Sequence, residues 1–159
     1  MALFISTFVN KIDKKGRVSV PATFRAALAN QSFAGIYVYK SLTCDALEGC
    51  GSDHMDMLGE SLTQLDPFSV EYEDLSMQIF GLSSQLPFDG EGRVILPQHL
   101  MEAAGITDSV AFVGKGRTFQ LWEPEAFRVA SEEARRRTLQ NRPSLLLRPG
   151  TSAREGGAS

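Results

Sequence analysis

Four basic side chains gather around one short turn near the N-terminus, and these residues have the clearest potential for chemistry. They are Lys11, Lys14, Lys15 and Arg17. The turn reads Asp13-Lys-Lys-Gly16, where aspartate can accept hydrogen bonds from nearby backbone N–H groups and glycine tolerates positive φ. A rigid turn that presents several cations can bind phosphates, and arginine can also contact guanine. We therefore predict a polyanion-binding site here, with a solvated charged loop as the simpler alternative.

The same turn recurs once, 76 residues further along the chain. Asp13-Lys-Lys-Gly-Arg-Val-Ser-Val-Pro21 matches Asp89-Gly-Glu-Gly-Arg-Val-Ile-Leu-Pro97, with identical Asp, Gly, Arg, Val and Pro. An internal repeat indicates two copies of one small unit. In the second copy Arg93 stands beside Asp89 and Glu91, which makes a poor surface for polyanions. An ion pair that braces the turn is therefore an equal alternative for Arg93.

Charge is distributed unevenly along the chain. The 159 residues have a formal net charge of −3, which excludes a uniformly basic nucleic-acid coat. Residues 1–39 nevertheless hold five basic residues and one acidic residue, whereas residues 40–88 hold one basic residue and nine acidic ones. An acidic chain thus carries one concentrated positive segment, and that segment contains the first turn. Its field can attract a polyanion over a range set by salt screening.

The sequence contains no recognisable catalytic motif and no typical metal-binding motif. Neither His54 nor His99 lies in a recognisable motif, and no nucleophile elbow, phosphate-binding loop or dinucleotide fingerprint occurs. Cys44, Cys50 and His54 follow a spacing looser than that of zinc sites, and two cysteines make no disulfide framework. We predict a protein that is not an enzyme, with no catalytic residue, metal or cofactor.

Each copy of the turn is embedded in the same order of predicted elements. A strand precedes the turn, a strand follows it, and a proline then starts a short helix. A further strand follows in each copy. The segment after that strand is strand-like at 118–122 in the second copy, whereas residues 44–50 of the first copy are much less strand-like. Further helices and strands are predicted at 22–28 and 98–104 (helices), and at 36–39, 110–113 and 118–122 (strands).

Helices are predicted between the repeats and after the second one. Met55, Leu58, Leu62 and Leu65 step at helical spacing, as do Tyr72, Leu75, Ile79 and Leu82, and a third helix is predicted from Pro124 to about Arg137. From about residue 139 the composition turns to Arg, Pro, Gly, Ser and Ala, which predicts a disordered tail.

The duplicated signature resembles that of the SpoVT/AbrB swapped-hairpin domains. Two copies joined by helices, followed by Phe119-Gln-Leu-Trp122 and Phe127, are similar to the MraZ family of bacterial regulators. The family commonly begins Phe-Arg-Gly, where this chain has Phe4-Ile5-Ser6, so one expected cation is missing and Lys14 adds another nearby. The resemblance covers about residues 4 to 137.

The resemblance implies a fold, a domain organisation and a function. The fold is α+β and mainly β, with duplicated AbrB-like swapped-hairpin β-barrel units, short helices and a helical linker. The expected function is regulation of the division and cell-wall gene cluster, through short direct repeats in double-stranded DNA upstream of its own gene. A ring-shaped, nucleoid-associated homo-oligomer would bind them through Lys15 and Arg17, with Arg93 in the second copy. The domains are 7–54 and 83–126 (SpoVT-AbrB), 55–82 (helical linker), 127–138 (C-terminal helix) and 139–159 (tail).

Two further expectations concern partners and location. A protein-interaction module, similar to an antitoxin, is the main alternative, and its acidic middle segment would be the interface. No apolar run approaches the 18 residues of a membrane span, and residues 1–11 lack the pattern of a signal peptide. We therefore expect a cytoplasmic protein that does not enter a membrane.

Overall fold

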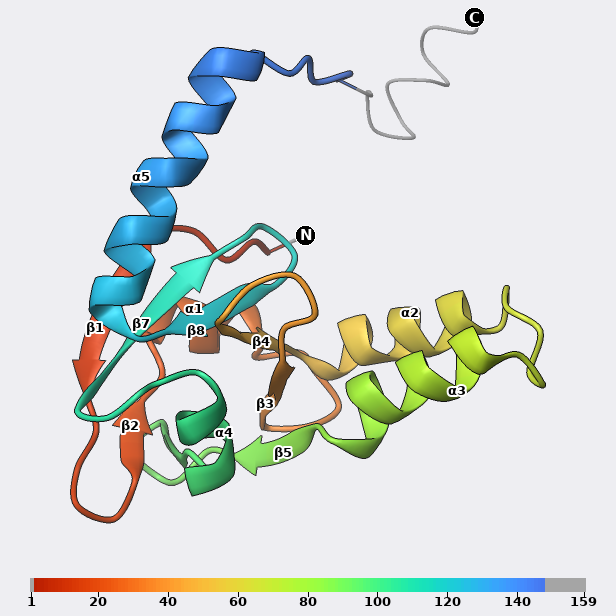
Figure 1. Cartoon of the computed structure of the whole chain (residues 1–159). Helices are drawn as coiled ribbons and strands as arrows, with labels where there is room; N and C mark the ends of the chain where they lie inside the picture. Colours follow the sequence, from red (N-terminus) through yellow and green to blue (C-terminus); the bar gives the residue numbers. More distant parts are fainter. Residues whose placement is uncertain (1, 148–159) are drawn as a thin grey trace, which may run out of the picture. The chain divides into compact units, whose positions relative to one another are not determined.

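The strands of the described chain form a six-stranded sheet and a separate two-stranded ribbon (Figure 1). The computed structural model describes residues 2–147. The large sheet has the order β1-β7-β8-β4-β3-β5, and the ribbon pairs β2 with β6. The strands are β1 Thr7–Lys11, β2 Arg17–Ser19, β3 Gly35–Lys40, β4 Leu47–Cys50, β5 Ser84–Pro87, β6 Arg93–Ile95, β7 Ser109–Gly114 and β8 Phe119–Trp122. The helices are α1 Ala22–Ala27, α2 Ser52–Leu62, α3 Val70–Ser76 with the π-helical η1 Met77–Gly81, α4 Gln98–Ala103 and α5 Pro124–Asn141.

The order of elements repeats, and the two copies exchange strands. The series β1, β2, α1, β3, β4 is followed after α2 and α3 by β5, β6, α4, β7, β8. Strand β1 pairs with β7 of the other copy, and β5 pairs with β3 in the equivalent way. Each copy therefore supplies its first strand to the hairpin of the other. The mixed content, sheet-rich with short helices, confirms the α+β class.

Proline and glycine set the limits of the short helices where the sequence predicts them. Pro21 and Pro97 immediately precede α1 and α4, where a missing N–H costs nothing. Gly105 follows α4 with a φ of +66°, the left-handed conformation that ends many helices. The predicted strands at 36–39, 110–113 and 118–122 are also confirmed as β3, β7 and β8.

The core lies between the large sheet, the ribbon and the two short helices. Phe24 of α1 is fully buried, and its ring centroid lies 5.2 Å from those of both Phe4 and Phe119. Val18 and Val94 are both 1% exposed and pair directly across the ribbon. One core therefore contains side chains from both copies, and the ribbon is held to it by its inward valines.

Residues 44–50 correct one sequence-based prediction, because Leu47–Cys50 forms the regular strand β4 between β3 and β8. Residues 44–50 contain no aromatic side chain, and the aromatic ring beside this strand is that of Phe119 in β8. A Cβ on Gly49 would lie 2.3 Å from Cε2 of Phe119, so that ring occupies the space beside the glycine. Glycine in a strand often marks such a close approach.

The two central helices run alongside one another and extend from the sheet (Figure 1). Helix α2 starts at Ser52 and ends at Leu62, so Leu65 lies beyond it in the connecting turn. Ser69 caps α3 by accepting a hydrogen bond from the N–H of Tyr72 at 3.1 Å. The predicted second helix passes into the π-helical turn η1, where the N–H of Leu82 donates to the carbonyl of Met77 at 2.9 Å. Regular 3.6-residue spacing does not continue to its end.

Among the described residues, 2–127 form one compact unit and 128–147 belong to a second. Helix α5 starts at Pro124 as predicted and continues to Asn141, beyond the predicted end at Arg137. The carboxylate of Glu123 accepts hydrogen bonds from the N–H groups of Glu125 and Ala126, at 3.2 Å and 2.7 Å, which caps the start of the helix. Of the predicted tail, residues 148–159 lie outside the described residues.

Candidate functional site

The first basic turn is braced by a single carboxylate. Asp13 Oδ1 accepts from the backbone N–H groups of Lys15 and Arg17 at 2.9 Å and 2.8 Å. The guanidinium Nε of Arg17 donates to Asp13 Oδ2 at 2.6 Å. Gly16 has a φ of +83°, which explains why glycine stands there. The turn thus presents its side chains from a defined backbone.

The second turn has the same bonds. Asp89 Oδ1 accepts from the N–H groups of Glu91 and Arg93, both at 2.9 Å, and Arg93 Nε donates to Asp89 Oδ2 at 2.9 Å. Arg93 also lies 3.5 Å from the carboxylate of Glu91. The bracing role that the sequence suggested for the arginines therefore exists in both copies. Arg17 differs in having cationic neighbours in place of a second acid.

These bonds hold the two carboxylates in their charged form. The backbone N–H of Arg17 is the largest cause that lowers the pKa of Asp13 below its ordinary value of 3.8, and that of Arg93 does the same for Asp89. The guanidinium of each arginine adds to the effect. Both turns therefore keep their brace through the neutral pH range.

We expect a carbon-detected NMR titration of Asp13 and Asp89 to give midpoints below 3.8. Because the folded pKa lies below the unfolded one, each carboxylate stabilises the fold above about pH 4 and loses that contribution as pH falls through the lowered pKa. The melting temperature of Asp13→Asn should accordingly fall less than that of the wild type on acidification. A midpoint for Asp13 at or above 3.8 would contradict the brace.

The β2–β6 ribbon brings the two arginines onto one face. Arg17 pairs with Ile95 and Ser19 pairs with Arg93, so these four side chains share the side opposite the buried valines. The hydrogen bond to Asp89 is the main cause that raises the pKa of Arg93, Glu91 adds to it, and the charge of Asp13 in the first turn makes a smaller contribution. The chain therefore places two arginines diagonally on one exposed ribbon.

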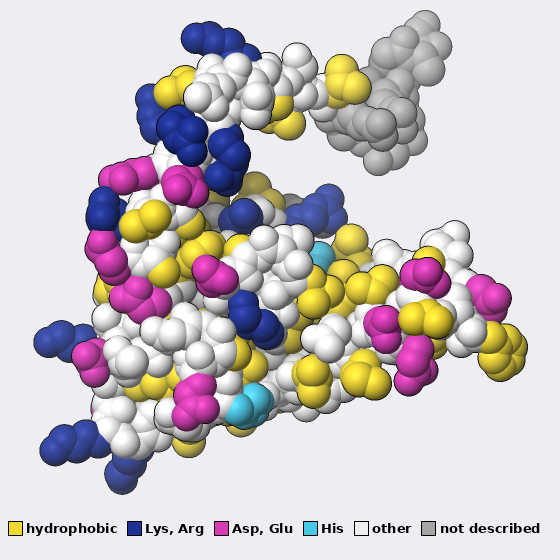
Figure 2. Space-filling model, viewed as in Figure 1, with side chains coloured by type: hydrophobic (Ala, Val, Ile, Leu, Met, Phe, Trp, Pro, Cys, Tyr) yellow, Lys and Arg dark blue, Asp and Glu magenta, His cyan; other side chains and the backbone are white. Residues whose placement is uncertain are grey.

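The lysines lie at different places around this ribbon. Lys14 and Lys15 are exposed at the tip of the first turn. Lys11 is exposed on β1, opposite Ser109 of the large sheet, and so belongs to the sheet rather than to the ribbon. We use the name basic patch for Lys14, Lys15, Arg17 and Arg93. In Figure 2, dark blue side chains stand out at the end of the molecule formed by the β1–β2 turn, whereas acidic side chains gather over α2 and α3.

Three residues beside the basic patch were missed by the sequence reasoning. Ser19 and Ile95 lie on its face, and Ile95 is 61% exposed although it is apolar. Asn10 ties β1 to β2 by donating through Nδ2 to the carbonyl of Ser19 at 2.7 Å. Alternation with Val18 and Val94 could have indicated the outward direction of Ser19 and Ile95. The pairing that brings them together is not visible in the sequence.

The histidines and cysteines do not form a metal site in the described part of the chain. Cys44 donates to the hydroxyl of Ser41 at 3.4 Å, Cys50 is buried, and His99 is exposed on α4. Burial raises the pKa of the Cys50 thiol to about 12, with a smaller contribution from Glu48, so the thiolate is disfavoured. Within residues 2–147, no three His, Cys, Asp or Glu side chains gather as metal ligands would. None of the helices in this range is both long and apolar enough to cross a membrane.

Comparisons with known proteins give consistent matches. A family model described as "MraZ protein, putative antitoxin-like" matches residues 79–147. A Rickettsia bellii protein named transcriptional regulator MraZ is 50% identical over 129 residues, covering 80% of this chain and 86% of the relative. Proteins of the same name from Rickettsia felis and Rickettsia akari are 49% and 47% identical over 127 residues, covering 80% of this chain and 85% of each relative.

Proposed function

Because the chain belongs to the MraZ family of transcriptional regulators, we propose that it regulates transcription by binding double-stranded DNA through the basic patch. The protein acts as a regulator and not as an enzyme. The single observation that carries the proposal is the ribbon face on which Arg17 and Arg93 lie together, beside Lys14 and Lys15. Dark blue side chains stand out at the end of the molecule that carries the β1–β2 turn, although the whole chain has a formal net charge of −3 (Figure 2).

The shape of the ribbon suits the major groove. A two-stranded β-ribbon fits into that groove, which is about 12 Å wide, and can present outward side chains to base edges. Arg17 is suited to guanine or to a phosphate, whereas Lys14 and Lys15 at the turn are suited to phosphates. Lys11 on β1 would meet the DNA backbone at the margin. The first copy supplies the larger electrostatic share because Glu91 stands where the first copy has Lys15.

The exchange of β1 and β5 supports a duplicated swapped-hairpin fold. In that view residues 7–54 and 83–126 are the two SpoVT-AbrB domains, and residues 55–82 are the helical linker. The C-terminal helix expected at 127–138 corresponds to α5, which spans Pro124–Asn141, and the tail expected at 139–159 follows the second domain. The two ribbon strands then come from equivalent places in the two domains. A common ancestry for the two DNA-facing turns explains their shared bonds.

Assembly and targets follow from the family resemblance. We propose a ring-shaped homo-oligomer, associated with the nucleoid in the cytoplasm, that binds short direct repeats in the division and cell-wall gene cluster, including its own promoter. Several weak sites on one assembly gain affinity through effective concentration when each meets one repeat. Exposed apolar side chains on the central helices, such as Met57 and Met77, offer surface for contacts between copies.

Fluorescence anisotropy on two labelled duplexes tests the proposal. One duplex carries the DNA upstream of the protein's own gene, and the other carries the same bases in scrambled order. We expect tighter binding to the native duplex. For both duplexes, the logarithm of the association constant should fall linearly with the logarithm of the salt concentration. Equal weak binding to both duplexes, or none, would reject sequence-specific regulation through this surface.

An antitoxin-like interaction with a protein partner is the second candidate. Helices α2 and α3 are rich in acidic residues, and the connection between them carries Phe68, which is 95% exposed. The family description also contains the word antitoxin-like. A small basic protein that co-purifies in fixed stoichiometry, and is lost on Phe68→Ser, would favour this function. DNA binding without any such partner would favour the first.

A further inference from the structure

An apolar side chain stands outward on the ribbon beside the basic patch. Ile95 is 61% exposed and lies directly opposite Arg17 in the register of β2 and β6. A β-branched residue suits a strand, but the other outward positions of this ribbon hold Arg17, Ser19 and Arg93. Of the four side chains on this face, Ile95 is the one without a hydrogen-bonding group.

Backbone hydrogen bonds bring Ile95 close to Arg17. The N–H of Leu96 donates to the carbonyl of Gly16 at 2.9 Å, one position along the ribbon. Hydrogen-bonded and non-hydrogen-bonded pairs alternate along an antiparallel ladder, so Arg17 and Ile95 form a non-hydrogen-bonded pair. In such a pair the facing Cα atoms lie about 4.5 Å apart, and the side chains are closer than in the other kind.

Ile95 also borders the first basic turn. Its Cγ2 atom lies 3.7 Å from the place that a Cβ on Gly16 would take, so its side chain lies against the backbone of the turn. Ile95, Lys14 and Lys15 line one hollow of the surface. The apolar group therefore adjoins both the arginine and the lysines of the basic patch.

Arg17 can contact a base while it braces the turn. Its hydrogen bond to Asp13 uses Nε, which leaves both Nη groups of Arg17 without a hydrogen-bond partner among the described residues. In the second copy, Nη1 of Arg93 instead lies 3.5 Å from the carboxylate of Glu91. Two free Nη groups are what a bidentate contact to guanine requires. Ile95 thus stands beside the arginine that is better prepared for base contact.

Thymine is the base that suits an apolar side chain in the major groove. The base edges there present polar donors and acceptors, together with the C5 methyl group of thymine. An apolar side chain placed over a polar edge removes its water without replacing the hydrogen bonds, which is unfavourable. Contact with the methyl group instead buries apolar surface on both partners.

We propose that Ile95 contacts the C5 methyl group of a thymine next to the guanine that Arg17 contacts. The inference rests on the DNA binding proposed above and adds the base that the apolar side chain selects. Neighbouring base pairs lie about 3.4 Å apart along the duplex, which is similar to the separation of the two facing residues. Two side chains from different copies of the repeat then read one base step.

The two copies differ at this position, which gives the ribbon a direction. Equivalent positions of the copies pair across the ribbon, so an approximate twofold axis relates Arg17 to Arg93 and Ser19 to Ile95. Serine can form hydrogen bonds with several bases, whereas isoleucine forms none. Arg17 therefore faces the selective side chain and Arg93 faces the permissive one. The two ends of the bound DNA site should differ accordingly.

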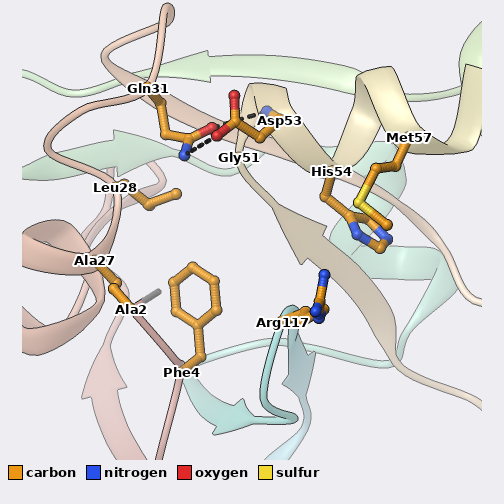
Figure 3. A pocket seen from close by; sticks show the side chains of 10 residues that line it. All are labelled: Ala2, Phe4, Ala27, Leu28, Gln31, Gly51, Asp53, His54, Met57 and Arg117. Atoms are coloured by element: carbon orange, nitrogen blue, oxygen red, sulfur yellow. Dashed lines mark hydrogen bonds between the residues drawn. The ribbon is translucent and has the colours of Figure 1, made fainter. Parts of the chain in front are cut away.

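A second place where apolar and basic side chains meet lies outside the ribbon. It is the pocket in Figure 3, whose lining includes Phe4, His54 and Arg117 and shares no residue with the ribbon or the basic patch. Arg117 is exposed there, on the turn between β7 and β8. Arg117→Gln therefore provides a control that removes a cation elsewhere, and it should leave discrimination between thymine and deoxyuridine unchanged.

Fluorescence anisotropy with deoxyuridine-substituted duplexes tests the contact. The probe is the duplex upstream of the protein's own gene, in which each thymine in turn is replaced by deoxyuridine, which lacks only the C5 methyl group. We expect at least one replacement to weaken binding of the wild type about threefold to fivefold, the effect of one buried methyl group. A wild type that prefers the native to the scrambled duplex, but binds every deoxyuridine duplex equally well, overturns the contact and leaves the proposed function standing. Equal binding to the native and scrambled duplexes rejects both.

Ile95→Ser and Ser19→Ala form a matched pair of variants on the same face. Ile95→Ser gives the second copy the residue of the first, and it should bind the native duplex and the sensitive deoxyuridine duplex with equal affinity. Ser19→Ala should keep the sensitivity of the wild type. Full sensitivity in Ile95→Ser would show that another side chain reads the methyl group, and the assignment would fail. Should Ile95→Ser not fold, Ile95→Gln takes its place under the same criterion.

Discussion

Replacing Arg17 with alanine is expected to weaken binding to the native duplex by about tenfold to one-hundredfold. A bidentate contact to a base contributes on the order of 1–3 kcal/mol, and each lost phosphate contact lowers the slope of the salt dependence by about 1. Arg17 holds the ribbon face next to Lys14 and Lys15, so no other arginine in the first copy can take over its place. Anisotropy at several salt concentrations measures both the affinity and the slope.

Two variants separate DNA contact from bracing of the turn. Arg93→Ala removes the equivalent brace, Arg93 Nε to Asp89, from a turn with acidic neighbours, and should weaken DNA binding less than Arg17→Ala. Asp13→Asn keeps the Arg17 cation but loses its carboxylate partner. If Asp13→Asn weakens binding as strongly as Arg17→Ala at an unchanged salt slope, Arg17 acts through the turn. Unchanged affinity and slope in Arg17→Ala would remove it from the interface.

Replacing Gly49 with alanine is expected to destabilise the fold by about 1–3 kcal/mol, through overpacking of the core. The added Cβ would lie 2.3 Å from Cε2 of Phe119, and that ring is fully buried. Phe119 cannot move freely, because its ring centroid lies 4.8 Å from that of Phe4 and 5.2 Å from that of Phe24. Urea denaturation at constant m-value measures the loss.

Gly90→Ala provides the matched control for Gly49→Ala. A Cβ at Gly90 meets no atom within 4 Å, and the residue lies in the exposed second turn. We expect a change within about 0.5 kcal/mol for this variant. Equal effects at both glycines would indicate a general cost of losing glycine. A neutral Gly49→Ala would show that the Phe119 ring repacks without penalty.

Local signals were sufficient to predict the repeat and its turns. Asp13 and Gly16 predict a turn because an aspartate acceptor and a positive φ are needed within a few residues of one another, and both are observed. Pro21 and Gly105 limit helices for equally local reasons, which are the missing N–H and the left-handed backbone. The assignment of DNA contact to Lys11, Lys14, Lys15, Arg17 and Arg93 stays a prediction.

Structural features that depend on residues far apart in the chain could not be predicted from local sequence patterns. Strand β4 has a weak strand pattern because Gly49 accommodates a ring from Phe119, 70 residues further along the chain. The π-helical turn at Met77–Gly81 interrupts a helical spacing that continues in the sequence to Leu82. The pocket between His54 and Arg117 depends on a turn and a helix that lie far apart in the chain.

The sequence alone determined that this protein has two copies of one braced turn, that the first copy is basic, and that the copies follow the same order of elements. These properties depend on residues within about ten positions, where hydrogen bonds and backbone preferences are local. Only the tertiary structure decided that β2 pairs with β6 and that each copy supplies a strand to the other. Strand pairing depends on burying Val18 and Val94 in one shared core, and alternation in a sequence states which face is apolar but not which strand will cover it. That pairing sets Arg17 and Arg93 diagonally on one face of the ribbon.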